Sequence, residues 1–382
     1  MKMERKKQSA IKSIDDDSVN SKTKKKNGRQ SMAKKVKNEL EVDRTFEESG
    51  TETKRGSLSS KQIKRKRSIC GQKITPSAQV AMSTFLTSTT TTGVDCLRKD
   101  FAELKTYVPP NYDHSVYKEH AARNRYKDVV CLDATRVVLT QNVPPEHDYI
   151  HANWIKMEHV DKKFIAAQGP LENTISDFWR MIHQENAVTI LMLCKIEECG
   201  KVKCAQYWPT EQGSYKTYGS MFVNNKKLRF RSSLVENDDK TIIYTLEVLP
   251  EGCSNSVITK LYYYQEWPDR GVPGSCLSVL RLIKYIDTAG PCVVHCSAGI
   301  GRTGTIIAIE TGVQRLLKGN QVNIKDIVIQ LRNQRASSVQ TEAQYIFVHV
   351  CLLNYIMLKM PNMKNREAVV RFQDKVDTAN MA

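Results

Sequence analysis

The chain has 382 residues, enough for one large or two ordinary domains, and a formal net charge of +17. Its charged first residues are not followed by an apolar segment, and its longest apolar run, 345–358, is interrupted by His349 and Asn354, so we expect no signal peptide and no membrane span. The 11 cysteines have no paired spacing, which predicts a reducing, intracellular location: the cytoplasm, with the nucleus as a second compartment.

The first 80 residues are polar and basic, with 22 Lys and Arg against 10 Asp and Glu, few aromatic side chains and almost no periodicity. This composition predicts a disordered basic N-terminal segment over 1–80. Its basic clusters, at 24–37 and 64–67, either contact an acidic partner or an import receptor or form a solvated tail, and both interpretations stay open. We expect no main role in nucleic-acid binding, because no helix-turn-helix, zinc module or aromatic-studded basic sheet is recognisable.

Residues 81–92 are mostly Ser and Thr and are predicted to form a linker, with the folded domain over 93–360 and a polar tail over 361–382. The domain should begin with a helix at 94–104, since Leu97, Phe101 and Leu104 share one face. Periodicity also favours several later elements: helices at 174–185, 275–289, 325–334 and 343–358, a buried strand at 187–193, and antiparallel strands between 218 and 264.

Three cysteines, Cys194, Cys199 and Cys204, follow one another at intervals of five residues. Neither a CxxC pair nor a nearby histidine completes a set of four zinc ligands. We therefore expect ordinary thiols here, and neither a metal nor a cofactor.

The stretch 295–303 combines an anion site with a nucleophile. A short apolar strand, 291–295, precedes it and a helical pattern, 303–318, follows it, which predicts a strand, a tight loop and the first turn of a helix. Amides of such a loop bind phosphate when they point inward, and Gly299 and Gly301 permit that curl. Arg302 adds a forked donor for two phosphate oxygens. Cys296, at the floor of this positive cup, is expected to attack phosphorus as a thiolate.

The Cys-x5-Arg spacing inside 295–304 resembles the signature of the cysteine-based protein tyrosine phosphatases. Further blocks of that family have counterparts at 123–129, 148–153, 164–170, 197–209, 267–273 and 339–345. In the second of these, His151 replaces the first Asn of the family's usual Asp-Tyr-Ile-Asn-Ala-Asn. The resemblance implies an α/β fold, a twisted mixed β-sheet flanked by helices with the site at its carboxyl edge. The amino-acid sequences of these blocks are similar in character to those of the expanded single-domain, non-receptor phosphatases of nematodes.

The resemblance assigns the catalytic steps to five side chains besides the arginine. Cys296 would be the nucleophile, and Asp269 the general acid of the first step and the base of the second. Gln340 would position the water that hydrolyses the intermediate. His295 would orient the cysteine backbone and support the thiolate, and Thr303 would stabilise the thiolate as it leaves.

The resemblance also assigns the residues that hold the phosphate and its arginine. The phosphate oxygens would be bound by the signature loop and the arginine after it: Ser297, Ala298, Gly299, Ile300, Gly301 and Arg302. Glu198 would pair with that arginine, although the adjacent Glu197 stays open as the alternative. Lys203 would approach the loop 267–273, which carries Asp269 and is called the acid loop below. Gln344 would act together with Gln340 as the second glutamine of the block 339–345.

The implied activity is hydrolysis of phosphotyrosine on proteins through a cysteinyl-phosphate intermediate, and the implied partners are phosphotyrosine proteins. Tyr126 would stack on the substrate ring and make the pocket too deep for phosphoserine, while Asp128 would hold the substrate backbone. One alternative is a phosphotyrosine-binding pseudophosphatase, although such proteins usually lack the equivalent of Asp269, Cys296 or Arg302. The other is a dual-specificity phosphatase, a class that lacks the aromatic rim.

Overall fold

The computed structural model describes residues 74–230, 241–286, 288–363 and 365–381. The predicted disordered segment 1–80 therefore lies outside the described residues, apart from 74–80, and the prediction is wrong for 76–80, which belong to a helix. Within the described chain, nine strands form one mixed sheet in the order β1-β2-β3-β11-β4-β10-β9-β8-β7. Their bounds are β1 Arg136–Val138, β2 Tyr149–Ile155, β3 Phe164–Ala167, β4 Thr189–Met192, β7 Tyr215–Tyr218, β8 Met221–Phe230, β9 Thr241–Pro250, β10 Val257–Tyr264 and β11 Cys292–His295. A separate hairpin consists of β5 Glu197–Glu198 and β6 Lys201–Val202.

The centre of the sheet is parallel and its flanks are antiparallel. Strand β11 lies between β3 and β4 and runs parallel to both, and β4 is also parallel to β10. Every residue of β3, β4 and β11 is buried, because helices cover both faces of a parallel centre. The carboxyl ends of β3, β11 and β4 therefore meet at one edge, which positions the loops described below.

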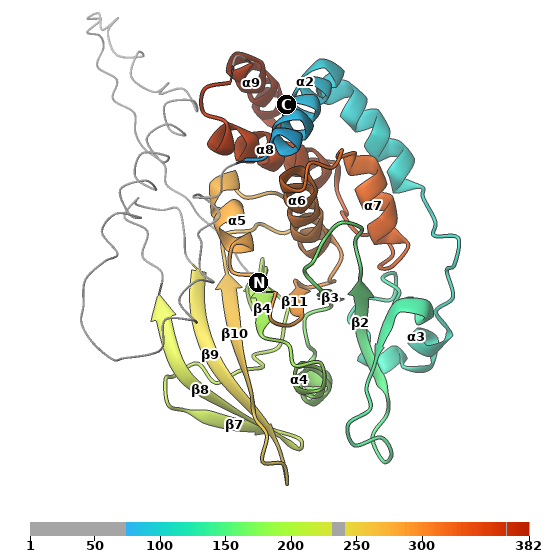
Figure 1. Cartoon of the computed structure of the whole chain (residues 1–382). Helices are drawn as coiled ribbons and strands as arrows, with labels where there is room; N and C mark the ends of the chain where they lie inside the picture. Colours follow the sequence, from blue (N-terminus) through green and yellow to red (C-terminus); the bar gives the residue numbers. More distant parts are fainter. Residues whose placement is uncertain (1–73, 231–240, 287, 364, 382) are drawn as a thin grey trace, which may run out of the picture. The chain divides into compact units, whose positions relative to one another are not determined.

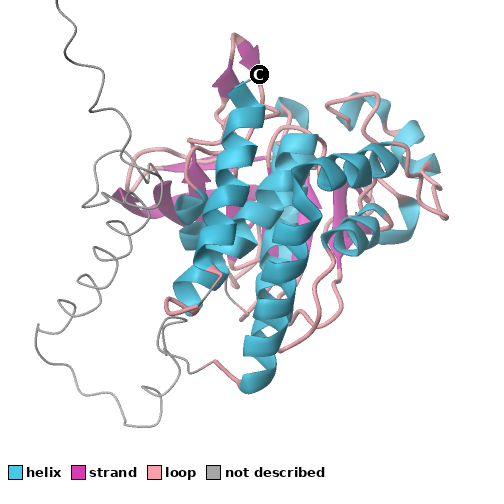
Figure 2. Cartoon of the chain, turned by 90° about the horizontal axis from the view of Figure 1, so that it is seen from above, coloured by secondary structure: helices cyan, strands magenta, loops and turns pink. Residues whose placement is uncertain are grey.

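Helices pack on both faces of the sheet (Figure 1). Helix α4, Ile175–Gln184, lies on one face, and α6, Gly301–Leu317, packs on β3 and β11 from the other. Four more helices pack around α6 and cover the central strands when seen from above (Figure 2): α5 Cys276–Ile283, α7 Ile324–Arg332, α8 Glu342–Lys359 and α2 Pro76–Lys105. The remaining elements are α9 Arg366–Met381, α3 Ser115–Glu119 and three short turns, η2 Ala121–Arg123, η3 Asp133–Thr135 and η4 Glu172–Thr174. This architecture confirms the predicted mixed α/β sheet flanked by helices.

The predicted Ser/Thr linker at 81–92 is wrong, because those residues belong to α2. The helix runs from Pro76 to Lys105 and is broken at Gly93, whose φ of 74° is not helical. Its first half buries apolar side chains at helical spacing against α8 and α9, among them Met82 and Phe85. The hydroxyl of Thr90 donates to the backbone oxygen of Leu86 at 2.9 Å, so a polar composition is compatible with a docked helix.

The expectation of a polar tail over 361–382 is also wrong for most of its length, because α9 spans Arg366–Met381. Val369, Phe372 and Val376 are buried, and α9 packs on α2 and α8. Helix α5 is shorter than its predicted range of 275–289 and ends at Ile283. Beyond it, the backbone N–H groups of residues 284–286 bond to the carbonyl oxygens three residues earlier, as in a 3₁₀ turn.

We predict that Phe85→Ala lowers the free energy of unfolding by about 3–5 kcal/mol, because a buried phenyl ring would leave a cavity. Phe85 is 4% exposed and stacks on His349 with ring centroids 6.1 Å apart. Val80 is in the same helix and 65% exposed, so Val80→Ala should change stability by no more than about 0.5 kcal/mol. Urea unfolding of both variants measures the difference; equal small effects would mean that the helix is not docked in solution.

Candidate active site

The loop between β11 and α6 surrounds a sulfur atom with hydrogen-bond donors. Cys296 is 4% exposed, and its Sγ accepts from the Gly299 N–H at 3.3 Å and from the Thr303 hydroxyl at 3.3 Å. Gly299 has a φ of 71°, and a Cβ there would lie 2.1 Å from the backbone oxygen of Ala167. Only glycine fits this position, so the inward turn of the loop is fixed by both conformation and space.

Arg302 lies beside the cysteine and is held by a two-point ion pair. Its Nη1 and Nη2 each donate to one carboxylate oxygen of Glu198, both at 2.6 Å, and Nη1 also donates to the backbone oxygen of Leu193 at 2.9 Å. Burial alone would lower the pKa of Arg302, but the Glu198 carboxylate outweighs it and raises that pKa. Of the two candidate glutamates, Glu198 is therefore the partner in this structure, whereas Glu197 is exposed.

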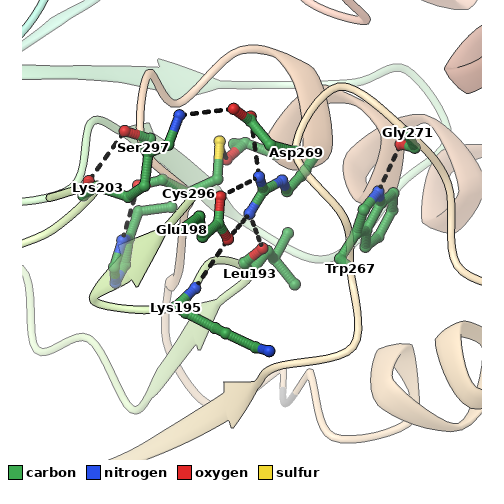
Figure 3. Close-up of polar contacts among 12 residues, drawn as sticks. Leu193, Lys195, Glu198, Lys203, Trp267, Asp269, Gly271, Cys296 and Ser297 are labelled. Atoms are coloured by element: carbon green, nitrogen blue, oxygen red, sulfur yellow. Dashed lines mark hydrogen bonds and ion pairs between the residues drawn. The ribbon is translucent and has the colours of Figure 1, made fainter. Parts of the chain in front are cut away.

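The acid-loop carboxylate points toward the same cup (Figure 3). Asp269 accepts from Lys203 Nζ at 2.6 Å and from Arg302 Nη2 at 2.9 Å. Burial would raise the pKa of Asp269, but Lys203 and Arg302 lower it, and Asp269 in turn raises the pKa of Lys203. Trp267 Nε1 donates to the backbone oxygen of Gly271 at 3.0 Å and ties the two ends of this loop together. The two cations therefore favour the ionised form of this carboxylate, which lines the same cavity as Cys296.

An aromatic rim completes the cavity. The hydroxyl of Tyr126 lies 2.8 Å from Ser297 Oγ, and the Ser297 hydroxyl donates to the backbone oxygen of Lys203 at 2.9 Å. Since serine has one proton to give, the Tyr126 hydroxyl is the donor in the first of these bonds. The cavity has a volume of about 740 Å³, and Asp128 also lines it.

The two glutamines of the 339–345 block lie against the start of α6. The amide oxygen of Gln344 accepts from the backbone N–H of Gln340 at 3.0 Å, and both side chains line the cavity. A Cβ on Gly301 would come within 3.1–3.2 Å of both amide groups. Their side chains are thus within reach of a group held by the signature loop.

His295 is completely buried under the loop. Its Nδ1 lies 3.3 Å from the backbone oxygen of Cys296, which can only accept, so Nδ1 carries the proton and Nε2 accepts from the Tyr207 hydroxyl at 2.7 Å. Burial lowers the pKa of His295 to about 4, which keeps the ring neutral. Tyr207 was not predicted from the sequence, because nothing in its local pattern points to His295.

Arg335 is the second residue that the sequence motifs missed. It is fully buried and donates to the backbone oxygens of Ala298 and Gly299, both at 3.0 Å, so it supports the signature loop from outside the cavity. Ile300, the remaining loop residue, is buried and precedes α6. The structure thus brings every predicted site residue to the cavity or to the loop that forms it.

Within the described residues, no group of three His, Cys, Asp or Glu side chains could hold a metal ion. None of the described helices is long and apolar enough to cross a bilayer.

Comparison with known proteins agrees with this geometry. A model of the protein-tyrosine phosphatase family matches residues 120–354. The chain is 40% identical over 256 residues to the receptor-type tyrosine-protein phosphatase zeta of Rattus norvegicus. This match covers 65% of this chain and 11% of that protein. It is 39% identical over 266 residues to the tyrosine-protein phosphatase Lar-like of Caenorhabditis elegans, 68% of this chain and 12% of that protein. It is 36% identical over 278 residues to the receptor-type tyrosine-protein phosphatase epsilon of Homo sapiens, a match that covers 69% of this chain and 38% of that protein.

This chain belongs to the protein-tyrosine phosphatase family. The matched part is homologous to the catalytic domains of receptor-type members, and the chain spans well under half the length of the three relatives named above.

Three buried histidines should make stability depend on pH. Burial lowers the pKa values of His151, His295 and His349 to about 3, 4 and 4, whereas the unfolded chain titrates near 6.5. Below about pH 6.5 the unfolded state therefore binds more protons than the folded state, and stability falls with decreasing pH. We predict a loss of about 1–2 kcal/mol per histidine between pH 6.5 and 5. Urea titrations across this range measure it; a flat profile would contradict neutral buried rings.

Proposed function

We propose that this chain is a protein tyrosine phosphatase that hydrolyses phosphotyrosine on proteins through a cysteinyl-phosphate intermediate. The observation that carries the proposal is the convergence of a thiol, a guanidinium and a carboxylate on one cavity: Arg302 contacts Asp269 at 2.9 Å, and both line the cavity that Cys296 floors. These are the groups that nucleophilic attack, charge stabilisation and proton transfer require.

In the first step, the Cys296 thiolate forms a bond to phosphorus while the bond from phosphorus to the tyrosyl oxygen breaks. The leaving oxygen takes a proton from Asp269 and departs as a phenol. Arg302 and the loop amides bind the equatorial oxygens as charge develops on them. Asp269 is ionised beside Lys203 and Arg302 here; a phosphate dianion would draw Arg302 toward itself and favour the protonated carboxyl.

In the second step, a water molecule attacks the phosphorus of the thiophosphate and the S–P bond breaks, releasing inorganic phosphate. Asp269, now a carboxylate, takes the proton from that water, which Gln340 positions. The Thr303 hydroxyl, 3.3 Å from Cys296 Sγ, stabilises the thiolate as it is released. No part of either step requires a metal ion.

Tyr126 supports tyrosine specificity over the dual-specificity alternative. Its hydroxyl is bonded to Ser297 of the signature loop, so its ring forms a wall that rises from the loop. Only a long, flat phosphotyrosine side chain reaches the sulfur past such a wall. The pseudophosphatase alternative is disfavoured because the nucleophile, the acid and the phosphate-binding arginine are all present. We further propose, from the residues of its family blocks, a likeness to the expanded nematode group of phosphatases, and a place of action in the cytoplasm or nucleus.

We predict that Asp269→Ala lowers kcat on a phosphotyrosine peptide by a factor on the order of 100–10,000, because the proton donor is lost while the anion cup remains. The loss should be small on an aryl phosphate whose acidic phenol departs unaided. Steady-state kinetics of wild type and variant on both substrates measure the contrast, with Cys296→Ser as the inactive control. Equal losses on both substrates would contradict the general-acid role, and an inactive wild type would contradict the proposed function.

We also predict that the N-terminal segment directs location and takes no part in catalysis. Deletion should stop at residue 73, because Thr75 caps α2 by accepting from the Ala78 N–H at 3.2 Å and Ala78 is buried. Peptide kinetics should be unchanged, whereas localisation or salt-sensitive retention on a polyanion should change, since the segment carries most of the net positive charge. The matched variant replaces only the cluster 64–67 by glutamines. If the deletion changes neither localisation nor retention on the polyanion, the segment does not direct location.

A further inference from the structure

Two buried rings bind the backbone of residues 123–129, the stretch that carries Tyr126 and that we call the rim loop. Tyr117, in α3, donates its hydroxyl proton to the backbone oxygens of Lys127 at 2.9 Å and Tyr126 at 3.1 Å. His151, in β2, contacts the backbone oxygen of Val129 at 2.9 Å. The two rings touch edge to face with centroids 5.8 Å apart, and α3 and β2 lie side by side in Figure 1. Together they bind the carbonyls on both sides of Asp128.

The proton of the His151 ring is fixed by its partners. The Val129 oxygen can only accept, so Nε2 of His151 carries the proton. Nδ1 then accepts from Arg335 Nη2 at 3.1 Å, because a guanidinium can only donate. Burial and the charge of Arg335 lower the pKa of His151 to about 3, so the ring keeps this donor and acceptor arrangement at every working pH.

Arg335 extends this contact to the signature loop. The same guanidinium that donates to His151 also donates to the backbone oxygens of Ala298 and Gly299. A continuous chain of hydrogen bonds therefore runs from the carbonyl of Val129 through His151 and Arg335 to the phosphate-binding loop. The bonds from His151 to Val129, from Arg335 to His151 and from Arg335 to Gly299 are buried, where a lost partner costs most.

We propose that His151 and Tyr117 are positioning residues that hold the rim loop in register with the signature loop, so that Tyr126 and Asp128 meet the substrate while Cys296 meets its phosphate. This rests on the proposed function. His151 touches neither substrate nor the reacting atoms and acts through the backbone of Val129. Rim geometry should affect binding of the substrate more than the chemical step, which begins after binding.

Two substitutions of His151 separate its two bonds. The amide of Asn lies near the position of Nδ1, so His151→Asn keeps an acceptor for Arg335 but cannot reach Val129. The amide of Gln extends to the position of Nε2, so His151→Gln keeps the donor to Val129. Tyr117→Phe removes one hydroxyl and keeps the ring. We expect His151→Asn and Tyr117→Phe each to raise KM for a phosphotyrosine peptide by about three- to tenfold with kcat within about twofold. His151→Gln keeps the bond to Val129 but loses the bond to Arg335, so it should raise KM less than His151→Asn does, again with kcat within about twofold.

The control is His349→Gln, which alters another buried, neutral histidine. His349 stacks on Phe85 and is far from the rim loop in sequence. Among the contacts described, its hydrogen bond stays within α8. This substitution should lower Tm without changing KM. Peptide binding is measured in parallel by titration in a Cys296→Ser background, which needs no turnover.

An inactive wild type would contradict the proposed function, and the binding titration would still test the positioning role. An active wild type with unchanged KM and Kd in His151→Asn and Tyr117→Phe would overturn the inference. Equal impairment of His151→Asn, His151→Gln and His349→Gln would also overturn it, because that pattern indicates a general loss of stability.

Discussion

The site depends on one constraint: a short loop that turns the N–H of Gly299 inward to the sulfur atom of Cys296. Inward amides leave the carbonyls of the same loop pointing outward into the protein, where each needs a donor. Arg335 supplies donors to two of them, the carbonyls of Ala298 and Gly299. Gly299 packs so closely on Ala167 that the loop cannot relax toward the sheet. The anion cup is therefore built before any anion arrives, which is the condition for electrostatic stabilisation without reorganisation.

Charge balance inside the cavity follows a similar logic. Arg302 is buried and would be costly there without a partner, and Glu198 neutralises it through a two-point bond. Lys203 and Asp269 form a second pair, which Arg302 joins. Because these pairs link the signature loop, the β5–β6 hairpin and the acid loop, arrival of a phosphate would rearrange contacts in all three at once.

Local sequence patterns predicted the fold class and which residues lie around the cavity, but not the extent of several helices. The signature loop is contiguous, so Cys296, Gly299 and Arg302 can be recognised as one strand–loop–helix unit. Tyr207 and Arg335 could not be recognised, because they reach the loop only through the packing of distant elements. The first half of α2 was missed for another reason: its Ser and Thr residues lie beside apolar positions such as Phe85, and composition outweighed periodicity. Boundaries such as the end of α5 depend on turn bonds that periodicity does not encode.

Arg302 and Arg335 show why burial alone does not define a role. Arg302 is matched by a carboxylate, whereas none of the hydrogen bonds that Arg335 donates in the described chain goes to one; its acceptors are carbonyls, an amide oxygen and the His151 ring. Burial lowers the pKa of Arg335, although arginine titrates so high that it stays charged. Arg335 therefore keeps its positive charge just outside the loop. Its hydrogen-bond acceptors are neutral groups, so they do not cancel that charge. That charge favours an anion inside the cup, and the neutral His151 is suited to this place because a carboxylate there would cancel it.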